Sequence, residues 1–434
     1  MVIGLGDHEN FLGSDVAAFV EHTKRAVSVG QDQIVELRRD SVKISTFKGE
    51  SVELKEFTVD WDASSASKGG WPSFMAKEIA DQPQAVGDTL MGRLDSDGRV
   101  KLDEFSGLEK LSEVNRIIIT ACGTAAYAGE VAKYAIEKWA KIPVSVELAH
   151  EFRYRDPIID SNTLILAISQ SGETMDTLMA IRYAKEQGAK VLSICNTQGA
   201  TLARESDATI YTHAGPEVAV ASTKAFTAQI TAGLLVALSL GWLRKAHPES
   251  VLKDLGQELL KLPRQVKKVL ESLDRMRDLG REYANAKSVL FLGRNVGFPI
   301  AMEGALKLKE LAYIHAEGFA AGELKHGPIA LIEAGQPVIV VVPSPKGEDS
   351  LHPKVISNIQ EIKARGAKVI AIAEVGDELV AQFADEVFSI PSSHPMMAAV
   401  LSVIPLQTFA LELASAKGLD VDQPRNLAKS VTVE

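Results

Sequence analysis

Apolar and polar positions follow different periods in different parts of the chain. From about residue 107, short apolar runs alternate with stretches whose apolar residues recur every three or four positions. Strands that alternate with helices in this way predict βαβ units and a parallel sheet. The expected strands of this region are 116–121, 144–148, 163–169, 190–196 and 208–212.

The same order of elements recurs further along the chain. Strands are expected at 287–293 and 337–343, followed by a helix at 357–365. The sequence Gly-Ala-Lys-Val-Ile-Ala-Ile, which begins at Gly366, echoes Gly-Ala-Lys-Val-Leu-Ser-Ile, which begins 178 residues earlier at Gly188.

A second match pairs Glu151-Phe152 with Gly318-Phe319. One Gly-Ala-Lys-Val match could arise by chance, because turns between helices and strands favour Gly. The shared order of several elements instead predicts a duplicated α/β domain. A charged helical segment at about 244–278 would connect the two copies.

Residues 1–58 have the pattern of a small β-rich segment, with strands expected at 35–37, 42–47 and 52–57. A loop rich in Ser, Ala and Gly at 62–70 is typical of a linker, and a helical stretch begins near Pro72. The expected division of the chain is a β-rich segment at 1–58, linker and leading helices at 59–106, a first α/β domain at 107–247, a connector at 248–278, a second α/β domain at 279–424 and a tail at 425–434.

Composition narrows the function classes. The 434 residues carry a formal net charge of −10, which disfavours nucleic acid and anionic membranes as general partners. The longest apolar stretch, 230–243, is short for a membrane span and predicts a buried helix. The N-terminus lacks the pattern of a signal peptide, and Cys122 and Cys195 are expected to be reduced thiols, so we expect a cytoplasmic protein.

The strongest chemical motif is Ser169-Gln-Ser-Gly-Glu-Thr174, which follows an apolar strand and opens a helix. Its hydroxyls and free backbone N–H groups meet at a helix N-terminus, where the helix dipole favours an anion. Simple helix capping would explain one hydroxyl, but three hydroxyls with Gln and Gly in six residues favour a phosphate site. Thr124 in Cys-Gly-Thr and Ser222 in Val-Ala-Ser-Thr-Lys are weaker candidates for the same crevice.

The second half holds the candidates for acid–base chemistry. Glu303, Lys307 and Glu310 share one face of a helix that is otherwise rich in Ala, Leu and Ile. They form either a solvated salt-bridge stripe or a partly buried group with a raised carboxylate pKa. His326 lies in a loop bounded by Gly and Pro, and Lys429 is a candidate Schiff-base amine, although a lysine near a terminus is usually solvated.

Together these segments closely resemble the glutamine:fructose-6-phosphate amidotransferase family over essentially the whole chain. The motifs that carry the resemblance are C-G-T at 122–124, S-Q-S-G-E-T at 169–174, A-S-T-K-A-F at 221–226, E-G-A-L-K-L-K-E at 303–310, G-E-L-K-H-G-P at 322–328 and D-Q-P-R-N-L-A-K-S-V-T-V-E at 422–434. The resemblance implies an α/β fold of two tandem sugar isomerase (SIS) domains, each a parallel sheet flanked by helices, no cofactor and no metal, and a homodimer that acts on a sugar phosphate.

The resemblance also implies roles for particular residues. Glu310 would move a proton between C1 and C2 of the sugar, and Lys429 would form a Schiff base at C2. His326 would help to open the sugar ring across a dimer interface, and Lys307 would be a further polar group of the site. The implied substrate-binding residues are Thr124, Ser169, Gln170, Ser171, Thr174, Val220 and Ser222.

Two features depart from the family pattern. Ala125 stands where the family commonly has Ser, and no cysteine precedes Cys122, although the family's glutaminase domain uses an N-terminal cysteine. Residues 2–15 resemble the closing part of that domain, so residues 1–58 are expected to be a remnant of it, without glutamine hydrolysis. Two alternatives remain open: another SIS-type sugar-phosphate isomerase, and a sugar-phosphate-sensing regulatory module that would not need Glu310, His326 and Lys429 together.

Overall fold

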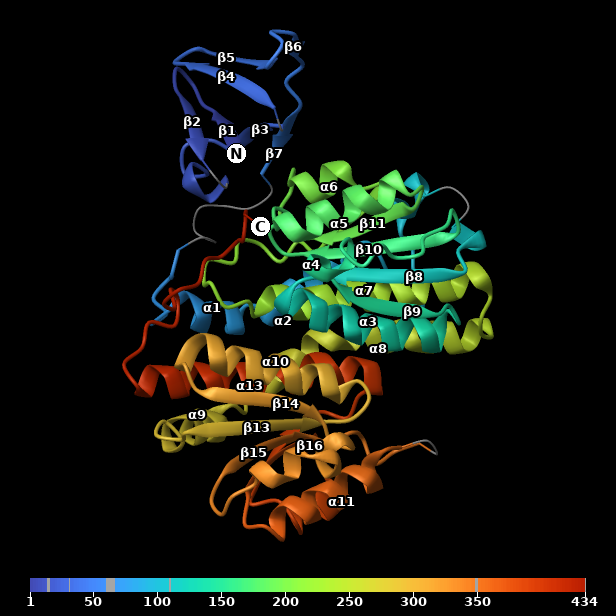
Figure 1. Ribbon diagram of the computed structural model, residues 1–434, viewed down its shortest axis with the longest axis vertical. Helices are drawn as coiled ribbons and strands as arrows, with labels where there is room; N and C mark the ends of the chain where they lie inside the picture. Colours follow the sequence, from blue (N-terminus) through green and yellow to red (C-terminus); the bar gives the residue numbers. More distant parts are fainter. Residues whose placement is uncertain (14–15, 31, 60–66, 109–110, 348–349, 434) are drawn as a thin grey trace.

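The computed structural model describes residues 1–13, 16–30, 32–59, 67–108, 111–347 and 350–433. Two parallel sheets, each flanked by helices, lie below a β-rich N-terminal segment (Figure 1). The C-terminal tail runs up from the second domain and ends close to the β-rich segment (Figure 1). The predicted α/β fold with two parallel-sheet domains is confirmed.

The first domain is a five-stranded parallel sheet in the order β12-β11-β10-β8-β9. Every residue of the central strand β10 is buried, as expected for a parallel sheet covered on both faces. Its strands are β8 (Arg116–Ala121), β9 (Val144–Leu148), β10 (Thr163–Ser169), β11 (Lys190–Cys195) and β12 (Ala208–Tyr211), and its helices are α3 (Gly123–Trp139), α4 (Ala149–Phe152), α5 (Met175–Glu186), α6 (Thr201–Glu205) and α7 (Lys224–Arg244).

The second domain repeats this topology, with the strand order β14-β13-β15-β16-β17. The expected pairing of Glu151-Phe152 with Gly318-Phe319 is wrong, because the first pair lies in α4 and the second in a strand. The elements are β13 (Ser288–Gly293), α10 (Gly297–Ala312), β14 (His315–Ala320), the 3₁₀ helices η5 (Glu323–His326) and η6 (Pro328–Leu331), β15 (Pro337–Val341), α11 (His352–Lys363), β16 (Lys368–Glu374), α12 (Glu378–Ala381), β17 (Glu386–Ile390) and α13 (Pro395–Ala416).

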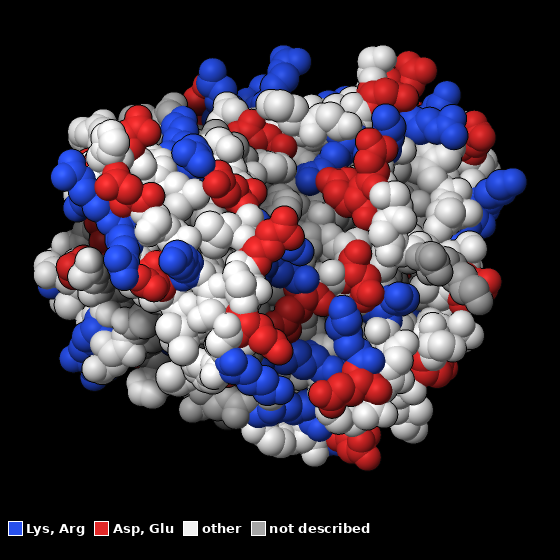
Figure 2. Space-filling view, turned by 90° about the horizontal axis from the view of Figure 1, so that it is seen from above, with Lys and Arg blue, Asp and Glu red and all other residues white. Residues whose placement is uncertain are grey.

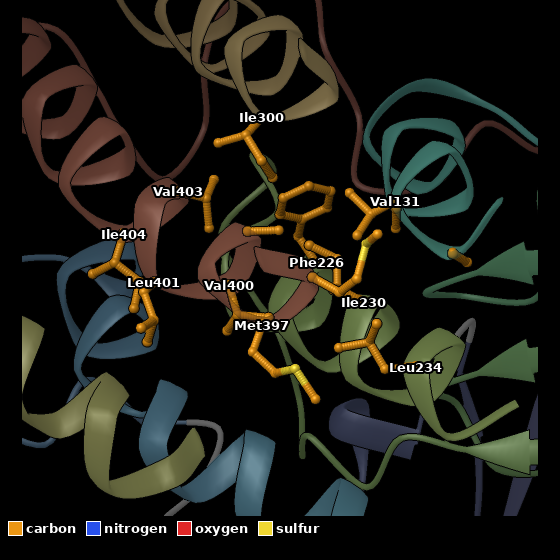
Figure 3. Close-up of a cluster of buried hydrophobic side chains, with 14 of the residues drawn as sticks. Val131, Phe226, Ile230, Leu234, Ile300, Met397, Val400, Leu401, Val403 and Ile404 are labelled. Carbon is orange, nitrogen blue, oxygen red and sulfur yellow. The ribbon is translucent and has the colours of Figure 1, made fainter. Parts of the chain in front are cut away.

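The two domains share a core where α3, α7, α10 and α13 meet. Figure 3 shows Phe226 and Ile230 of α7 facing Val131 of α3 and side chains of α13. Helices α7 and α13 are long and apolar enough to cross a membrane, but most of each is buried inside the protein. The predicted buried helix is confirmed as α7, which with 21 residues is longer than the apolar stretch suggested. Its burial marks it as a core helix.

The β-rich segment contains a four-stranded sheet and a three-stranded sheet. The single strand expected at 52–57 is in fact two short strands that belong to different sheets. The elements are β1 (Val2–Leu5), β2 (Asn10–Gly13), η1 (Val16–Ala18), β3 (Arg25–Ser28), β4 (Gln33–Arg38), β5 (Ser41–Thr46), β6 (Ser51–Val52) and β7 (Glu56–Thr58). Acidic and basic side chains lie interspersed on the face of the molecule seen from this end (Figure 2).

Further helices join the β-rich segment and the two domains. Helix α1 packs against α13 and α2 packs against α7, so the leading helices belong to the core of the two domains. The connector between the domains is helical, as expected, but it extends to residue 282. The joining elements are α1 (Phe74–Ala80), α2 (Gln82–Leu90), η3 (Asp103–Gly107), η4 (Leu111–Glu113), α8 (Glu249–Leu270) and α9 (Asp274–Glu282).

Candidate active site

The turn between β10 and α5 depends on a glycine. Gly172 has a φ of +67°, which favours Gly, and a Cβ there would lie 2.5 Å from the Cβ of Ala200 and 2.8 Å from the Sγ of Cys195. The carbonyl of Gln170 accepts hydrogen bonds from the backbone N–H groups of Asn196 and Thr197. The Ser169–Thr174 turn is therefore held against the end of the neighbouring strand β11.

The hydroxyls of this turn partly satisfy its own backbone. Ser169 Oγ accepts a hydrogen bond from the N–H of Gly172 at 3.0 Å, and Ser171 Oγ accepts one from the N–H of Glu173 at 3.2 Å. Accepting these bonds leaves the hydrogen of each hydroxyl available to donate to a ligand. Helix α5 begins directly after Thr174, so the partial positive charge of its N-terminus lies at the same turn.

A cavity of about 130 Å³ lies over this turn. Ser222 and Gln229 line it, and Ser222 Oγ and Gln229 Oε1 are buried without a hydrogen-bond partner among the described residues. Buried polar atoms are normally hydrogen-bonded, so these two atoms indicate a polar ligand. The predicted substrate-binding residues all line the cavity, namely Thr124, Ser169, Gln170, Ser171, Thr174, Val220 and Ser222, and Ala125 lies among them.

The C-terminal tail is fixed along its path to this cavity. The guanidinium of Arg425 lies 4.2 Å from the centroid of the Tyr313 ring, and its backbone N–H donates to the Tyr313 hydroxyl. Ser430 Oγ lies 3.1 Å from Ser171 Oγ, and the carbonyl of Val431 accepts a hydrogen bond from Met175. The tail is therefore attached to both domains.

These contacts deliver Lys429 to the cavity, which it lines together with Ser171. Its Nζ donates to Oε2 of Glu217 and to the carbonyl of Ala219, each at 2.7 Å. A lysine so near the terminus would be expected to be solvated, but only about a quarter of the Lys429 side chain is exposed.

The charged face of α10 is buried, which excludes a solvated salt-bridge stripe for Glu303 and Lys307. Lys307 Nζ lies 3.3 Å from Glu303 Oε1 and 2.7 Å from Glu310 Oε2, and it donates to Thr124 Oγ1 at 3.1 Å. The side chain of Glu310 is about one-fifth exposed. Thr124, at the start of α3, thereby connects the cavity of the first domain to the charged face of the second.

Burial and mutual attraction set the protonation states of Glu303 and Lys307. Burial raises the pKa of Glu303 to about 7, and the neighbouring Glu310 adds to the effect against the opposing attraction of Lys307. Burial alone would lower the pKa of Lys307, but Glu303 and Glu310 outweigh it and raise that pKa. At neutral pH the lysine is charged, and Glu303 lies close to its titration midpoint.

The structure does not bring His326 into this arrangement. His326 is exposed at the end of η5 and is absent from the residues that line the cavity. Its predicted role across a dimer interface stays a prediction.

Two buried carboxylates next to Lys429 were missed by the sequence analysis. Glu217 and Glu78 are 5% and 2% exposed. Glu217 lies in Gly-Pro-Glu-Val-Ala-Val-Ala, and an acidic residue inside an apolar run is a signal that could have identified it. Glu78 gives no comparable signal, because Glu is common on exposed helix faces.

The cysteines offer little reactivity. Cys122 and Cys195 are both free, and burial raises the pKa of Cys195 to about 12. Among the described residues, no group of three or more His, Cys, Asp or Glu side chains is arranged to hold a metal ion.

Comparison with known proteins defines the class first. The SIS domain family matches residues 110–239 and again residues 282–417, so each α/β domain is a SIS domain. The E. coli tagatose-6-phosphate ketose/aldose isomerase shares this fold, with a TM-score of 0.66 and 21% identity over 82% of the chain and 97% of that protein.

Similar proteins of known activity narrow the family further. Glutamine–fructose-6-phosphate aminotransferases (isomerizing) of Leifsonia xyli subsp. xyli and Streptomyces coelicolor are 65% and 60% identical over the whole chain, which spans 71% of each relative. The C-terminal domain of the Francisella tularensis glucosamine-fructose-6-phosphate aminotransferase superposes with a TM-score of 0.78 at 41% identity, covering 82% of the chain and all of that domain. The chain belongs to the glutamine–fructose-6-phosphate aminotransferase (isomerizing) family.

Proposed function

We propose that this chain binds fructose-6-phosphate and converts it to glucosamine-6-phosphate when ammonia is supplied, and isomerises hexose-6-phosphates without it. The observation that carries the proposal is the meeting of the Ser169–Thr174 turn and the amine of Lys429 at one cavity. An anion site alone would serve a sensor, whereas an amine beside it supplies a nucleophile for a carbonyl carbon.

The first step is to anchor the phosphate. Hydroxyl hydrogens of Ser169, Ser171 and Thr174 donate to its oxygens at the N-terminus of α5, and Thr124 lines the same cavity at the start of α3. The unpartnered Ser222 Oγ then serves the sugar hydroxyls. Anchoring at one end fixes the carbonyl carbon at a defined distance from Lys429.

The second step is covalent. Neutral Lys429 attacks C2 of the open-chain sugar, water leaves, and the resulting iminium acidifies the C1–H bond. Ammonia then adds to C2 and displaces the Lys429 amine, which leaves the imine of ammonia at C2 with the C1–H bond still acidified. Glu310 removes the C1 proton and returns it to C2, and the C1 hydroxyl loses its proton to give the aldehyde of glucosamine-6-phosphate. Lys307 is charged and buried between Glu303 and Glu310, where it stabilises the ionised form of these carboxylates.

A second subunit completes the site in this proposal. His326 is exposed on the described chain, so it would act in ring opening on the cavity of a partner copy in a homodimer. The expected location of the enzyme is the cytoplasm, where the sugar phosphate is available.

The test is chemical trapping. Borohydride added to the chain with fructose-6-phosphate should reduce the iminium to a stable adduct, and peptide mapping should place it on Lys429. A chain that binds fructose-6-phosphate yet yields no adduct, under conditions in which a known Schiff-base enzyme does, would favour the sensing module or an isomerase that works without the lysine.

A further inference from the structure

The amine of Lys429 has two acceptors in one short loop. Oε2 of Glu217 and the carbonyl of Ala219 each lie 2.7 Å from Nζ. Of these two, only the carboxylate can take a proton. It touches the atom that must become a neutral amine before it can attack a carbonyl carbon.

Glu217 is rigidly held. Its Oε1 accepts backbone hydrogen bonds from Thr223 at 2.8 Å and Ala225 at 3.0 Å, at the start of α7. This oxygen is engaged by the helix N-terminus, while Oε2 is directed to Lys429. The carboxylate therefore has a fixed orientation with one oxygen committed to the amine.

The loop is in turn held by a second carboxyl group. Oε1 of Glu78, on α1, accepts hydrogen bonds from the backbone N–H groups of Val218 at 2.6 Å and Ala219 at 3.2 Å. The same helix is tied to the tail, since both carboxylate oxygens of Asp422 accept backbone N–H groups at its start. Asp422 also accepts, through its carbonyl, the N–H of Val220. Helix α1, the loop and the tail thus form one closed network around Lys429.

We propose that Glu217 is the proton acceptor for Lys429 and that Glu78 is the positioning residue that holds the Glu217–Ala219 loop under the amine. The step is a transfer of one proton from the ammonium Nζ to Oε2 of Glu217, which leaves a neutral amine with a free electron pair and a neutral carboxylic acid. When the amine is released at the end of the cycle, the proton returns to Nζ. This inference rests on the proposed Schiff-base function.

The charges around the pair agree with this role. Among the described residues, Lys429 from the tail and Glu78 from α1 act on the charge of Glu217. Lys224 from α7 acts on Glu78 and is paired with Asp81 at 3.3 Å. Burial would raise the pKa of Glu217, but Lys429 and the backbone N–H groups outweigh it, so the carboxylate is ionised at rest. Burial together with Glu217 raises the pKa of Glu78 to about 8, so Glu78 is largely neutral at pH 7.

The test measures the rate of adduct formation with fructose-6-phosphate and cyanoborohydride between pH 6 and 10. Glu217→Gln keeps the shape but cannot take the proton. We expect adduct formation to fall roughly 100-fold or more at pH 7, with the deficit shrinking as hydroxide replaces the missing base. Binding of fructose-6-phosphate by calorimetry should stay within about threefold, and Glu271→Gln on the exposed end of α8 should behave as the parent chain.

Adduct formation by Glu217→Gln within about threefold of the parent at pH 7 would overturn the proposal, and so would a deficit that is equal at every pH. If the amide prevents folding, Glu217→Asp retains the acid and should trap more slowly with the parent pH dependence; a different dependence counts against the proposal. If the parent chain itself gives no adduct, the proposed function fails, whatever Glu217 does.

Glu78 is tested by a matched pair. Glu78→Gln keeps the Oε1 acceptor and resembles the neutral acid, so it should trap like the parent at pH 7. Glu78→Ala frees the loop and should trap roughly tenfold more slowly. Equal rates for the two variants at pH 7 would remove the positioning role.

Discussion

The two SIS domains have the same scaffold but different chemistry. In each domain, an aspartate accepts the backbone N–H of the second residue of a strand, Asp207 for Val191 and Asp385 for Val369. The lysine that begins each strand pairs with the same aspartate at 3.4 Å. These pairs are separated by the same 178 residues as the Gly-Ala-Lys-Val repeat.

The strand ends differ. Strand pairing aligns Val342 of the second domain with Ser169 of the first, so the phosphate turn corresponds to Val342-Pro343-Ser344. The turns that open α3 and α10 both contain a residue with left-handed backbone, Gly123 at +53° and Asn295 at +52°. The Ser169–Thr174 turn of the first domain is rich in hydroxyl groups, whereas Val342-Pro343-Ser344 of the second domain has a single one.

The helices after these turns differ in the opposite direction. Counting from Gly123 and Asn295, Glu303 corresponds to Val131 and Lys307 to Ala135, and both residues of α3 are buried apolar groups. The first domain therefore supplies the anion site, and the second supplies buried acid–base groups to the same region. Because the anion site and the acid–base groups come from different domains, a single SIS domain of this chain would not suffice for the proposed reaction.

The largest expected effect comes from removing the amine. Lys429→Arg keeps the charge but cannot form an imine, so synthesis of glucosamine-6-phosphate from ammonia should fall roughly 1,000-fold or more. Fructose-6-phosphate binding through the first domain should persist. Lys417→Arg, at the exposed end of α13, is the control, and synthesis by Lys429→Arg near the parent rate would contradict the assignment.

The buried charges of α10 should make stability depend on pH. Because the folded pKa of Glu303, about 7, exceeds the reference value of 4.5, the folded chain holds a proton that the unfolded chain has lost between these values. This contribution is fully present below pH 4.5 and is lost as pH rises through 7, with a span of roughly 3 kcal/mol. Glu303→Gln should therefore reduce the fall in melting temperature between pH 5 and pH 8. An unchanged fall would place the titration elsewhere.

Matched serines test which strand end binds the phosphate. Ser171→Ala removes a donor to an anion and should raise the KM for fructose-6-phosphate roughly 10- to 100-fold. Ser344→Ala, at the corresponding place in the second domain, should leave KM unchanged. Equal effects would show that the second domain shares the binding, and the comparison would fail.

The smallest effect should be the same in both domains. Asp207→Asn and Asp385→Asn each weaken a carboxylate bond to a strand N–H and its lysine pairs, and each should lower stability by roughly 1–2 kcal/mol. Thermal melts of the two variants would measure this. A loss of stability in only one of the two variants would show that the aspartate contributes differently in the two domains, although its hydrogen bonds are the same.

Much of the fold could be predicted because a continuous apolar run indicates a strand that is buried on both faces of a parallel sheet. Strands 116–121, 144–148 and 163–169 lie where the apolar runs placed them. The N-terminal segment was harder, since its strands alternate only weakly between buried and exposed positions. The alternating apolar and charged residues at 52–57 gave no sign that the chain passes from one sheet to another.

The sequence by itself determined the two α/β domains and the hydroxyl-rich turn, because apolar periodicity and a Gly-bearing strand-to-helix turn are local signals. Only the tertiary structure decided which charges are buried. Lys307 meets Thr124 across 183 residues, and Lys429 meets Glu217 across 212. Whether a charge is solvated or held in a site depends on such distant partners, which supply the hydrogen bonds that offset its desolvation.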